Sequence, residues 1–117
     1  MTLEQVKAMT DDEIRIKVSE LLEWKNIRVD RAYFDHYDDT GLVATNEVGY
    51  TLPLPDYPQD LNACHDMEKT LMDYEADTYI EWLNKMWCDF RATARQRCEA
   101  FILTREEVRK KGKTNDT

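Results

Sequence analysis

The triplet Cys64, His65 and Asp66 has the residue types that could most readily do chemistry. A thiol beside a histidine base can act as a nucleophile, and cysteine, histidine and carboxylate side chains are common zinc ligands. Adjacent residues on a helix point about 100° apart, so Cys64 and His65 cannot easily hold one ion. Zinc sites use spacings such as C-x2-C or H-x3-H, which let the ligands converge. The sequence therefore predicts no metal site at this triplet.

The remaining cysteines and histidines do not complete a reactive site. Cys88 and Cys98 stand ten residues apart without a second pair, and His36 with Asp38 is an isolated fragment. A nucleophile needs a base within hydrogen-bond reach, and nothing in the sequence brings His36 to Cys64. A cysteine on an apolar helix stripe usually behaves as a small buried hydrophobe. We therefore expect Cys64 to face inward and the chain not to be an enzyme.

Cofactor motifs are missing from the sequence. It contains no glycine-rich phosphate loop, no G-x-S-x-G and no H-E-x-x-H. Its three glycines leave little material for a nucleotide cradle, so we expect no cofactor. A phosphate could still be held by arginines, because guanidinium groups suit phosphate oxygens. The candidate anion-binding residues are Arg91, Arg95, Arg97 and Arg105.

Charge is unevenly placed along the 117 residues, whose net charge is −8. Residues 1–90 hold eight Lys and Arg against 20 Asp and Glu, a net charge of −12, whereas residues 91–117 hold eight against four, a net charge of +4. An acidic body repels a polyanion, so we expect no nucleic-acid partner. The basic end fits a solvated helix whose cations lie near its C-terminus, where the macrodipole favours them.

Length and composition indicate one domain over residues 1–117. A chain of this length buries roughly two thirds of its unfolded surface, so it needs neither disulfide nor metal to fold. No apolar run approaches the ~18 residues of a membrane span, and the acidic N-terminus is unlike a secretory signal. Three cysteines with scattered spacing favour reduced thiols in a cytoplasm.

Helical patterns occupy both ends of the chain. Thr10 and Glu13 form a capping-box pattern that starts a helix over 11–24, after a short helical turn within 3–9. A second capping box, Thr93 with Gln96, precedes a helix over 94–110. We expect residues 112–117 to be a frayed tail.

Two more helices are expected between the prolines and the second capping box. Asp60 is a natural N-cap for a helix over 60–73. The helical spacing of Ala76, Ile80, Leu83 and Trp87 predicts a helix over 77–87. Tyr79, Trp82 and Met86 widen this apolar stripe, so we expect the helix to bury more than one side.

Residues 27–51 are typical of short strands. They mix β-favouring residues with the turn residues 38-DDTG-41, which predicts two or three antiparallel strands. The prolines of 53–58 fix extended geometry, so 52–58 is expected to be a connector that cannot continue a strand ladder. The expected fold is α+β, a small antiparallel sheet sandwiched by helices, and a mostly helical bundle is the alternative.

Aromatic and acidic residues are interleaved just before the turn. Aromatic side chains are enriched at interface hot spots, so this stretch would suit an acidic protein-binding edge. The ordinary alternative is a hairpin rim with solvated aspartates. The candidate partner-binding residues are Tyr33, Phe34, Asp35, Tyr37, Asp38 and Asp39.

Two segments resemble the signatures of the phage ABA sandwich domain family, small proteins of bacteriophages and prophages. The first, 54-LPDYPQDL-61, carries Leu-Pro-x-Tyr followed by Asp-Leu, and the second is 92-ATARQRCEAF-101, in which Cys98 replaces a small residue such as alanine. Glu23-Trp24-Lys25 at the end of the first helix also fits, whereas 27–50 and 73–90 match weakly. The resemblance implies a sheet between helices and a place in the bacterial cytoplasm. It implies no activity and no functional residues.

These observations favour a phage or prophage accessory protein without catalytic activity. It would act by binding a host or phage protein in the bacterial cytoplasm, for example to counter a host function, and it could form a homodimer. Three alternatives remain open. The chain could sequester a small molecule or nucleotide, imitate the charge of DNA to block a host enzyme, or be an enzyme using Cys64 and a histidine.

Overall fold

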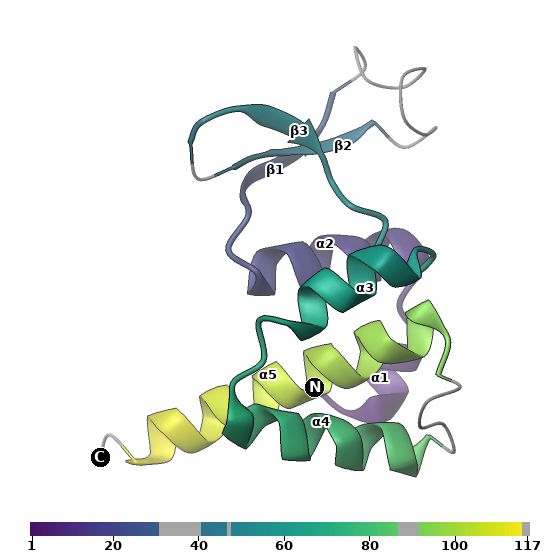
Figure 1. Ribbon diagram of the computed structural model, residues 1–117, viewed down its shortest axis with the longest axis vertical. Helices are drawn as coiled ribbons and strands as arrows, with labels where there is room; N and C mark the ends of the chain where they lie inside the picture. The colour runs from purple at the N-terminus through teal and green to yellow at the C-terminus, as the bar shows by residue number, and fades with distance from the viewer. Residues whose placement is uncertain (31–40, 47, 87–91, 116–117) are drawn as a thin grey trace.

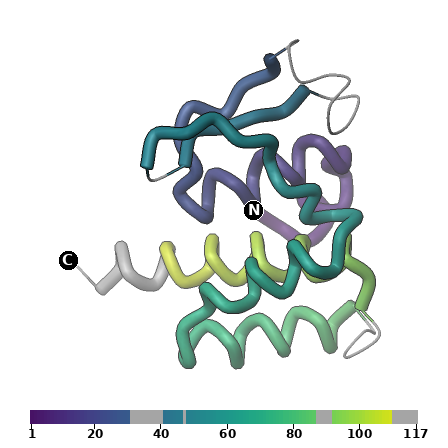
Figure 2. Tube along the Cα trace, turned by 45° about the horizontal axis from the view of Figure 1, so that its top comes forward, coloured from purple at the N-terminus to yellow at the C-terminus, as the bar shows by residue number. Residues whose placement is uncertain are grey.

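The computed structural model describes residues 1–30, 41–46, 48–86 and 92–115 (Figure 1). It has the α+β fold and the small antiparallel sheet expected from the sequence. The described helices lie on one side of the sheet in both views (Figures 1 and 2). The elements in chain order are α1 (Leu3–Lys7), α2 (Asp11–Leu21), β1 (Lys25–Val29), β2 (Leu42–Thr45), β3 (Thr51–Pro53), α3 (Leu61–Glu68), α4 (Asp73–Lys85) and α5 (Ala94–Asn115).

The three strands are ordered β1-β2-β3, and both pairs are antiparallel. The expectation that residues 52–58 cannot continue a strand ladder was wrong at its start, because Pro53 belongs to β3 and pairs with Val43. Proline is tolerated there because β3 is an edge strand, where a missing N–H costs no ladder bond. The Leu54 N–H continues the pairing by donating to Leu42 O at 3.0 Å.

The expected capping boxes are confirmed at α2 and α5. At α2, the Thr10 hydroxyl accepts from the Glu13 N–H at 3.1 Å, and Glu13 Oε1 accepts from the Thr10 N–H at 3.0 Å. Thr93 and Gln96 exchange the same two bonds at 2.9 and 3.1 Å. The helix that follows is longer than expected, since α5 extends to Asn115.

The break between α3 and α4 differs from the sequence expectation. Asp60 caps α3 as expected, but the helix ends at Glu68, and α4 already begins at Asp73. The Thr70 hydroxyl donates to Met67 O at 2.7 Å, a local bond that competes with helix continuation. Glu75 Oε1 then accepts from the Met72 N–H at 2.9 Å, which satisfies a backbone donor at the start of α4.

The burial of α4 agrees with the expected stripe except at Ile80. Ile80 was expected in the core but its side chain is 53% exposed. The buried positions are Tyr79, Leu83 and Met86. The helix is apolar on more than one side, and α5 covers only one of them, so spacing alone could not choose the face.

Two apolar clusters hold the layers together. The larger cluster surrounds Phe101 on α5. Helix α5 contacts the other four described helices. The smaller lies between the sheet and α2 and is formed by Leu42, Ala44 and Leu54 with partly buried side chains from α2 and β1. Buried Arg15 joins the layers, since it donates to Leu54 O and, at 3.2 Å, to Pro55 O.

Candidate functional site

A groove of about 570 Å³ lies where the sheet meets the helical layer. This volume is within the range of sites that bind small molecules or side chains. The wall on the sheet side comes from the end of α2, the start of β1 and the end of β2, and the opposite wall comes from α3 and the segments flanking it. The lining residues are Leu22, Glu23, Trp24, Lys25, Thr45, Asn46, Val48, Tyr57, Asp66 and Thr70.

Two left-handed residues place Trp24 and Lys25 in the groove wall. Glu23 has φ +67° and ends α2, with its N–H bonded to Glu20 O and the Trp24 N–H bonded to Ser19 O, both at 3.0 Å. This is the Schellman pattern, in which the left-handed position is usually glycine. Asn26 has φ +55° and lies in a β-bulge within β1.

Trp24 and Tyr57 form the aromatic part of the groove. The Trp24 indole N–H donates to the Tyr57 hydroxyl oxygen at 3.3 Å. Burial raises the pKa of Tyr57, and the negative charge of Asp66 raises it further, so the phenol keeps its proton at neutral pH. Tyr57 is only 4% exposed, so it anchors the partly exposed indole of Trp24, which supplies the accessible aromatic surface of the groove.

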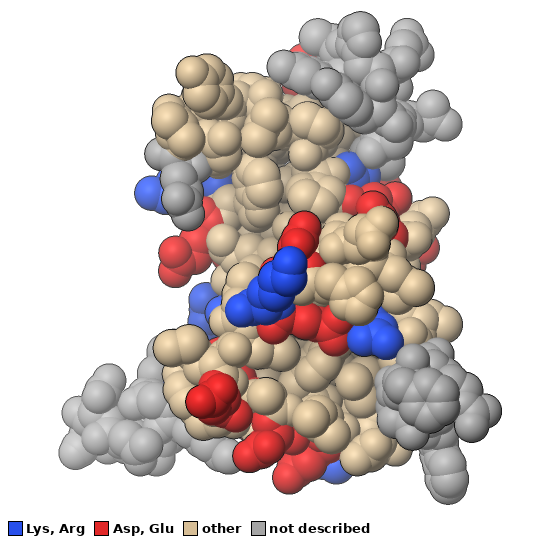
Figure 3. Space-filling model, viewed as in Figure 1, with Lys and Arg blue, Asp and Glu red and all other residues tan. Residues whose placement is uncertain are grey.

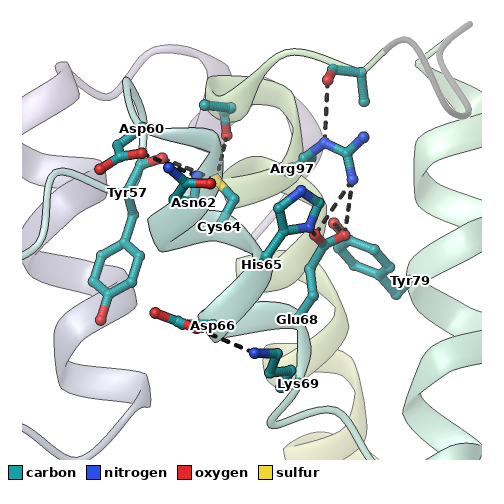
Figure 4. A network of polar contacts seen from close by, with 12 residues as sticks. Tyr57, Asp60, Asn62, Cys64, His65, Asp66, Glu68, Lys69, Tyr79 and Arg97 are labelled. Atoms are coloured by element: carbon teal, nitrogen blue, oxygen red, sulfur yellow. Dashed lines mark hydrogen bonds and ion pairs between the residues drawn. The ribbon is translucent and has the colours of Figure 1, made fainter.

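The charged lining of the groove is Glu23, Lys25 and Asp66, all exposed. Asp66 lies 3.5 Å from Lys69, and both side chains are more than three quarters exposed. Such a pair contributes little to stability, so it does not withdraw the carboxylate from a ligand. In Figure 4 Asp66 lies on the Tyr57 side of α3, away from Glu68.

The Cys-His-Asp triplet diverges into three environments (Figure 4). Cys64 is fully buried as expected, and its thiol donates to Tyr57 O at 2.9 Å and lies 3.9 Å from the Cys98 sulfur. His65 is exposed, with Nδ1 3.4 Å from Glu68 Oε1, and Asp66 lines the groove. No contact between the Cys64 thiol and the His65 ring is present, so the triplet does not assemble a nucleophile and its base.

Cys98 shares the interior position of Cys64. Contact with the Cys64 thiol and burial raise the pKa of Cys98. A thiol that resists ionisation is a poor nucleophile and a poor metal ligand. The described part of the chain holds no group of three His, Cys, Asp or Glu side chains placed to bind a metal ion.

Glu68 is the centre of a polar network that joins three helices. Its carboxylate accepts from the Tyr79 hydroxyl of α4 at 2.6 Å and from Arg97 Nη1 of α5 at 3.0 Å (Figure 4). Burial raises the pKa of Tyr79, and the bond to Glu68 raises it further, so Tyr79 acts as a neutral donor. The role of this network is to hold α3 against α4 and α5.

The three described candidate arginines do not converge on one point. Arg95 donates to Met9 O and pairs with Asp11, each at 2.6 Å, whereas Arg97 is held by Glu68. Arg105 Nε lies 2.9 Å from Glu75 Oε2. Each guanidinium already faces a carboxylate of the chain, and none lines the groove. Arg91 lies outside the described ranges.

The acidic aromatic stretch from Tyr33 to Asp39, together with Cys88, falls among the residues that the structure does not describe. The groove was missed by sequence reasoning. Trp24 and Tyr57 are far apart along the chain, and the only sequence signals nearby were Asn26, which marked a helix stop, and the run of prolines, which marked a connector.

Within the described ranges, no helix is both long enough and apolar enough to span a membrane. Comparisons with protein-family models, with curated proteins and with solved structures found no match for the chain.

Proposed function

We propose that this protein is a binding protein without catalytic activity, which receives a segment of a partner protein in the groove between the sheet and α3. The observation that carries the proposal is the half-buried Trp24 in the groove lining, whose indole N–H is bonded to the buried Tyr57 hydroxyl. Tryptophan and tyrosine are the side chains most enriched at interface hot spots, because they bury large area with few rotatable bonds.

The turn between β2 and β3 extends this surface with exposed apolar side chains. Val48, which lines the groove, is 77% exposed, and Tyr50 beside it is 67% exposed. Their backbone is held in place, because Asn46 Oδ1 accepts from the N–H groups of Val48 and Tyr50 at 3.0 and 2.9 Å. Exposed apolar side chains on an ordered turn cost little entropy when a partner covers them.

Local chemistry supports binding over catalysis. The chemically versatile side chains near the groove serve packing: Cys64 donates to a backbone carbonyl and His65 faces Glu68. The groove offers aromatic surface and exposed charges, which suit recognition. The resemblance to the phage ABA sandwich domain family supports a bacterial cytoplasmic setting and a host or phage protein as the partner.

A selection from a displayed peptide library on the full chain, followed by calorimetry with the selected peptides, tests the proposal. We expect Val48→Asn to weaken binding at least about fivefold, since it removes apolar contact area from the groove without changing its charge. Val29→Asn is the matched control, because Val29 is 59% exposed on β1 and does not line the groove. Selected peptides that bind both variants equally well would refute the proposal.

A further inference from the structure

We infer that the groove reads a basic segment of its partner, with a lysine or arginine side chain laid along Trp24 and its charged head between Glu23 and Asp66. This inference rests on the proposed function and names the partner chemistry. It concerns residues that come from the α2 end and from α3.

The aromatic part of the groove suits a long cationic side chain. Lysine and arginine bury their methylene stems on apolar surface while the charged head stays near water. A cation over an indole face gains further from the ring quadrupole, most strongly for tryptophan. Trp24 is half-buried, so part of the indole remains accessible. Its N–H is already bonded to Tyr57, which fixes the orientation of the ring.

The side chains that line the groove have an excess of negative charge, which favours a cationic ligand. Two carboxylates, Glu23 and Asp66, and one ammonium, Lys25, line the groove, so one added positive charge restores neutrality. The ion pair between Asp66 and the exposed Lys69 does not prevent a ligand from binding Asp66, because pairs of this kind contribute at most about 1 kcal/mol. An arginine would engage a carboxylate with two parallel hydrogen bonds.

The electrostatic field of the whole protein also favours a basic ligand. Residues 1–90, which supply the whole lining, carry a net charge of −12. Acidic side chains also gather over α4 on the face seen in Figure 3. Such a field raises the rate at which a basic segment arrives, and it disfavours acidic competitors.

The backbone conformation of Glu23 sets where one of the two groove carboxylates lies. It occupies the left-handed position of the Schellman pattern, where a residue with a side chain is strained and glycine is not. A glycine there would keep the turn and lose the carboxylate. The left-handed turn thus fixes the backbone from which the Glu23 carboxylate extends into the groove lining.

The test compares two blocked peptides on the full chain, one with two arginines spaced by glycine and one with citrulline in their place. Citrulline keeps the shape of arginine and removes its charge. Two-dimensional NMR at ~0.05 and ~0.2 M salt reports binding through the indole N–H of Trp24, assigned with Trp24→Phe. The expected result is a shift with the arginine peptide only, which weakens at higher salt.

Single substitutions identify the carboxylates that the arginine peptide contacts. We expect Asp66→Asn and Glu23→Gln each to weaken arginine-peptide binding about fivefold, and Glu20→Gln, an exposed carboxylate that does not line the groove, to change it less than about twofold. Equal binding of the citrulline peptide, or an equal effect of Glu20→Gln, would overturn the inference. If library selection yields neutral or acidic segments whose binding Val48→Asn weakens, the inference fails and the proposed function stands. If selected segments ignore the groove, both fail.

Discussion

Removal of the Glu68 carboxylate is the sharpest test of how the helices are held together. In Glu68→Ala, the Tyr79 hydroxyl and Arg97 Nη1 lose an acceptor at 2.6 and 3.0 Å. Arg97 is only 15% exposed and Tyr79 is buried, so water cannot fully replace the carboxylate. Hydrogen bonds to charged groups contribute roughly 1.5–3 kcal/mol each, and breaking a buried ion pair costs roughly 3–5 kcal/mol.

Because Glu68 is partly exposed to water, the expected loss of unfolding free energy is smaller than the sum of these values. The Glu68 side chain is 20% exposed, and Arg97 keeps a bond from Nε to Ala92 O at 3.1 Å. We therefore expect Glu68→Ala to lower the free energy of unfolding by about 3 kcal/mol, a large part of the ~5–15 kcal/mol typical of a domain. Glu68→Gln keeps one acceptor oxygen and should lose less than half as much.

Urea denaturation at pH 7, followed by far-ultraviolet circular dichroism, measures these losses. Glu20→Ala, which removes an exposed carboxylate from α2, serves as the control and should change stability by less than about 0.5 kcal/mol. A double-mutant cycle with Tyr79→Phe should give a coupling energy of about 1–2 kcal/mol. A loss below about 1 kcal/mol in Glu68→Ala, with no coupling to Tyr79, would refute the view that Glu68 organises the packing of α3 against α4 and α5.

Three further predictions concern the backbone and the core. Glu23→Gly should raise the unfolding free energy by about 1 kcal/mol in the same urea assay, because glycine relieves the left-handed strain, and a loss of stability would contradict the assignment of that turn. Arg15→Ala should lower it by about 3 kcal/mol, since two backbone carbonyls lose a buried charged donor; a loss near that of an exposed arginine such as Arg109→Ala would argue against this role. Contact with the Cys64 thiol and burial raise the pKa of Cys98, so its contribution to stability is complete below about pH 8.5, where the unfolded thiol ionises, and declines above it by up to about 1.4 kcal/mol per pH unit. Urea titrations under reducing conditions between pH 7 and 10 should therefore show a smaller alkaline decline in Cys98→Ala, and an unchanged slope would contradict the prediction.

Features set by neighbouring residues were predictable from the sequence. The capping boxes of α2 and α5 and the Asp60 cap follow from hydrogen bonds that close within three residues, so local spacing contains the whole signal. The burial of Cys64 was predictable for a related reason, because it lies on the apolar stripe of α3.

Features decided by tertiary contacts were not predictable. Pro53 could be placed in a strand only once β3 was known to be an edge, which depends on the order of the strands. The exposure of Ile80 depends on which side of α4 meets α5. The groove needs the end of α2 to approach α3, and the contact that joins them, Trp24 with Tyr57, spans 33 residues.

The residues of segments 54–61 and 92–101 mostly build the frame of the molecule. Tyr57 meets Trp24, Asp60 caps α3, and Arg97 ties α5 to Glu68. Thr45, Asn46 and Val48, which also line the groove, lie outside these two segments. A frame fixed by buried contacts tolerates change in an exposed turn, because such a turn contributes little to the core. Under the proposed function, substitutions at Asn46 and Val48 should therefore change which partner segments bind, while the helical scaffold and Trp24 stay in place.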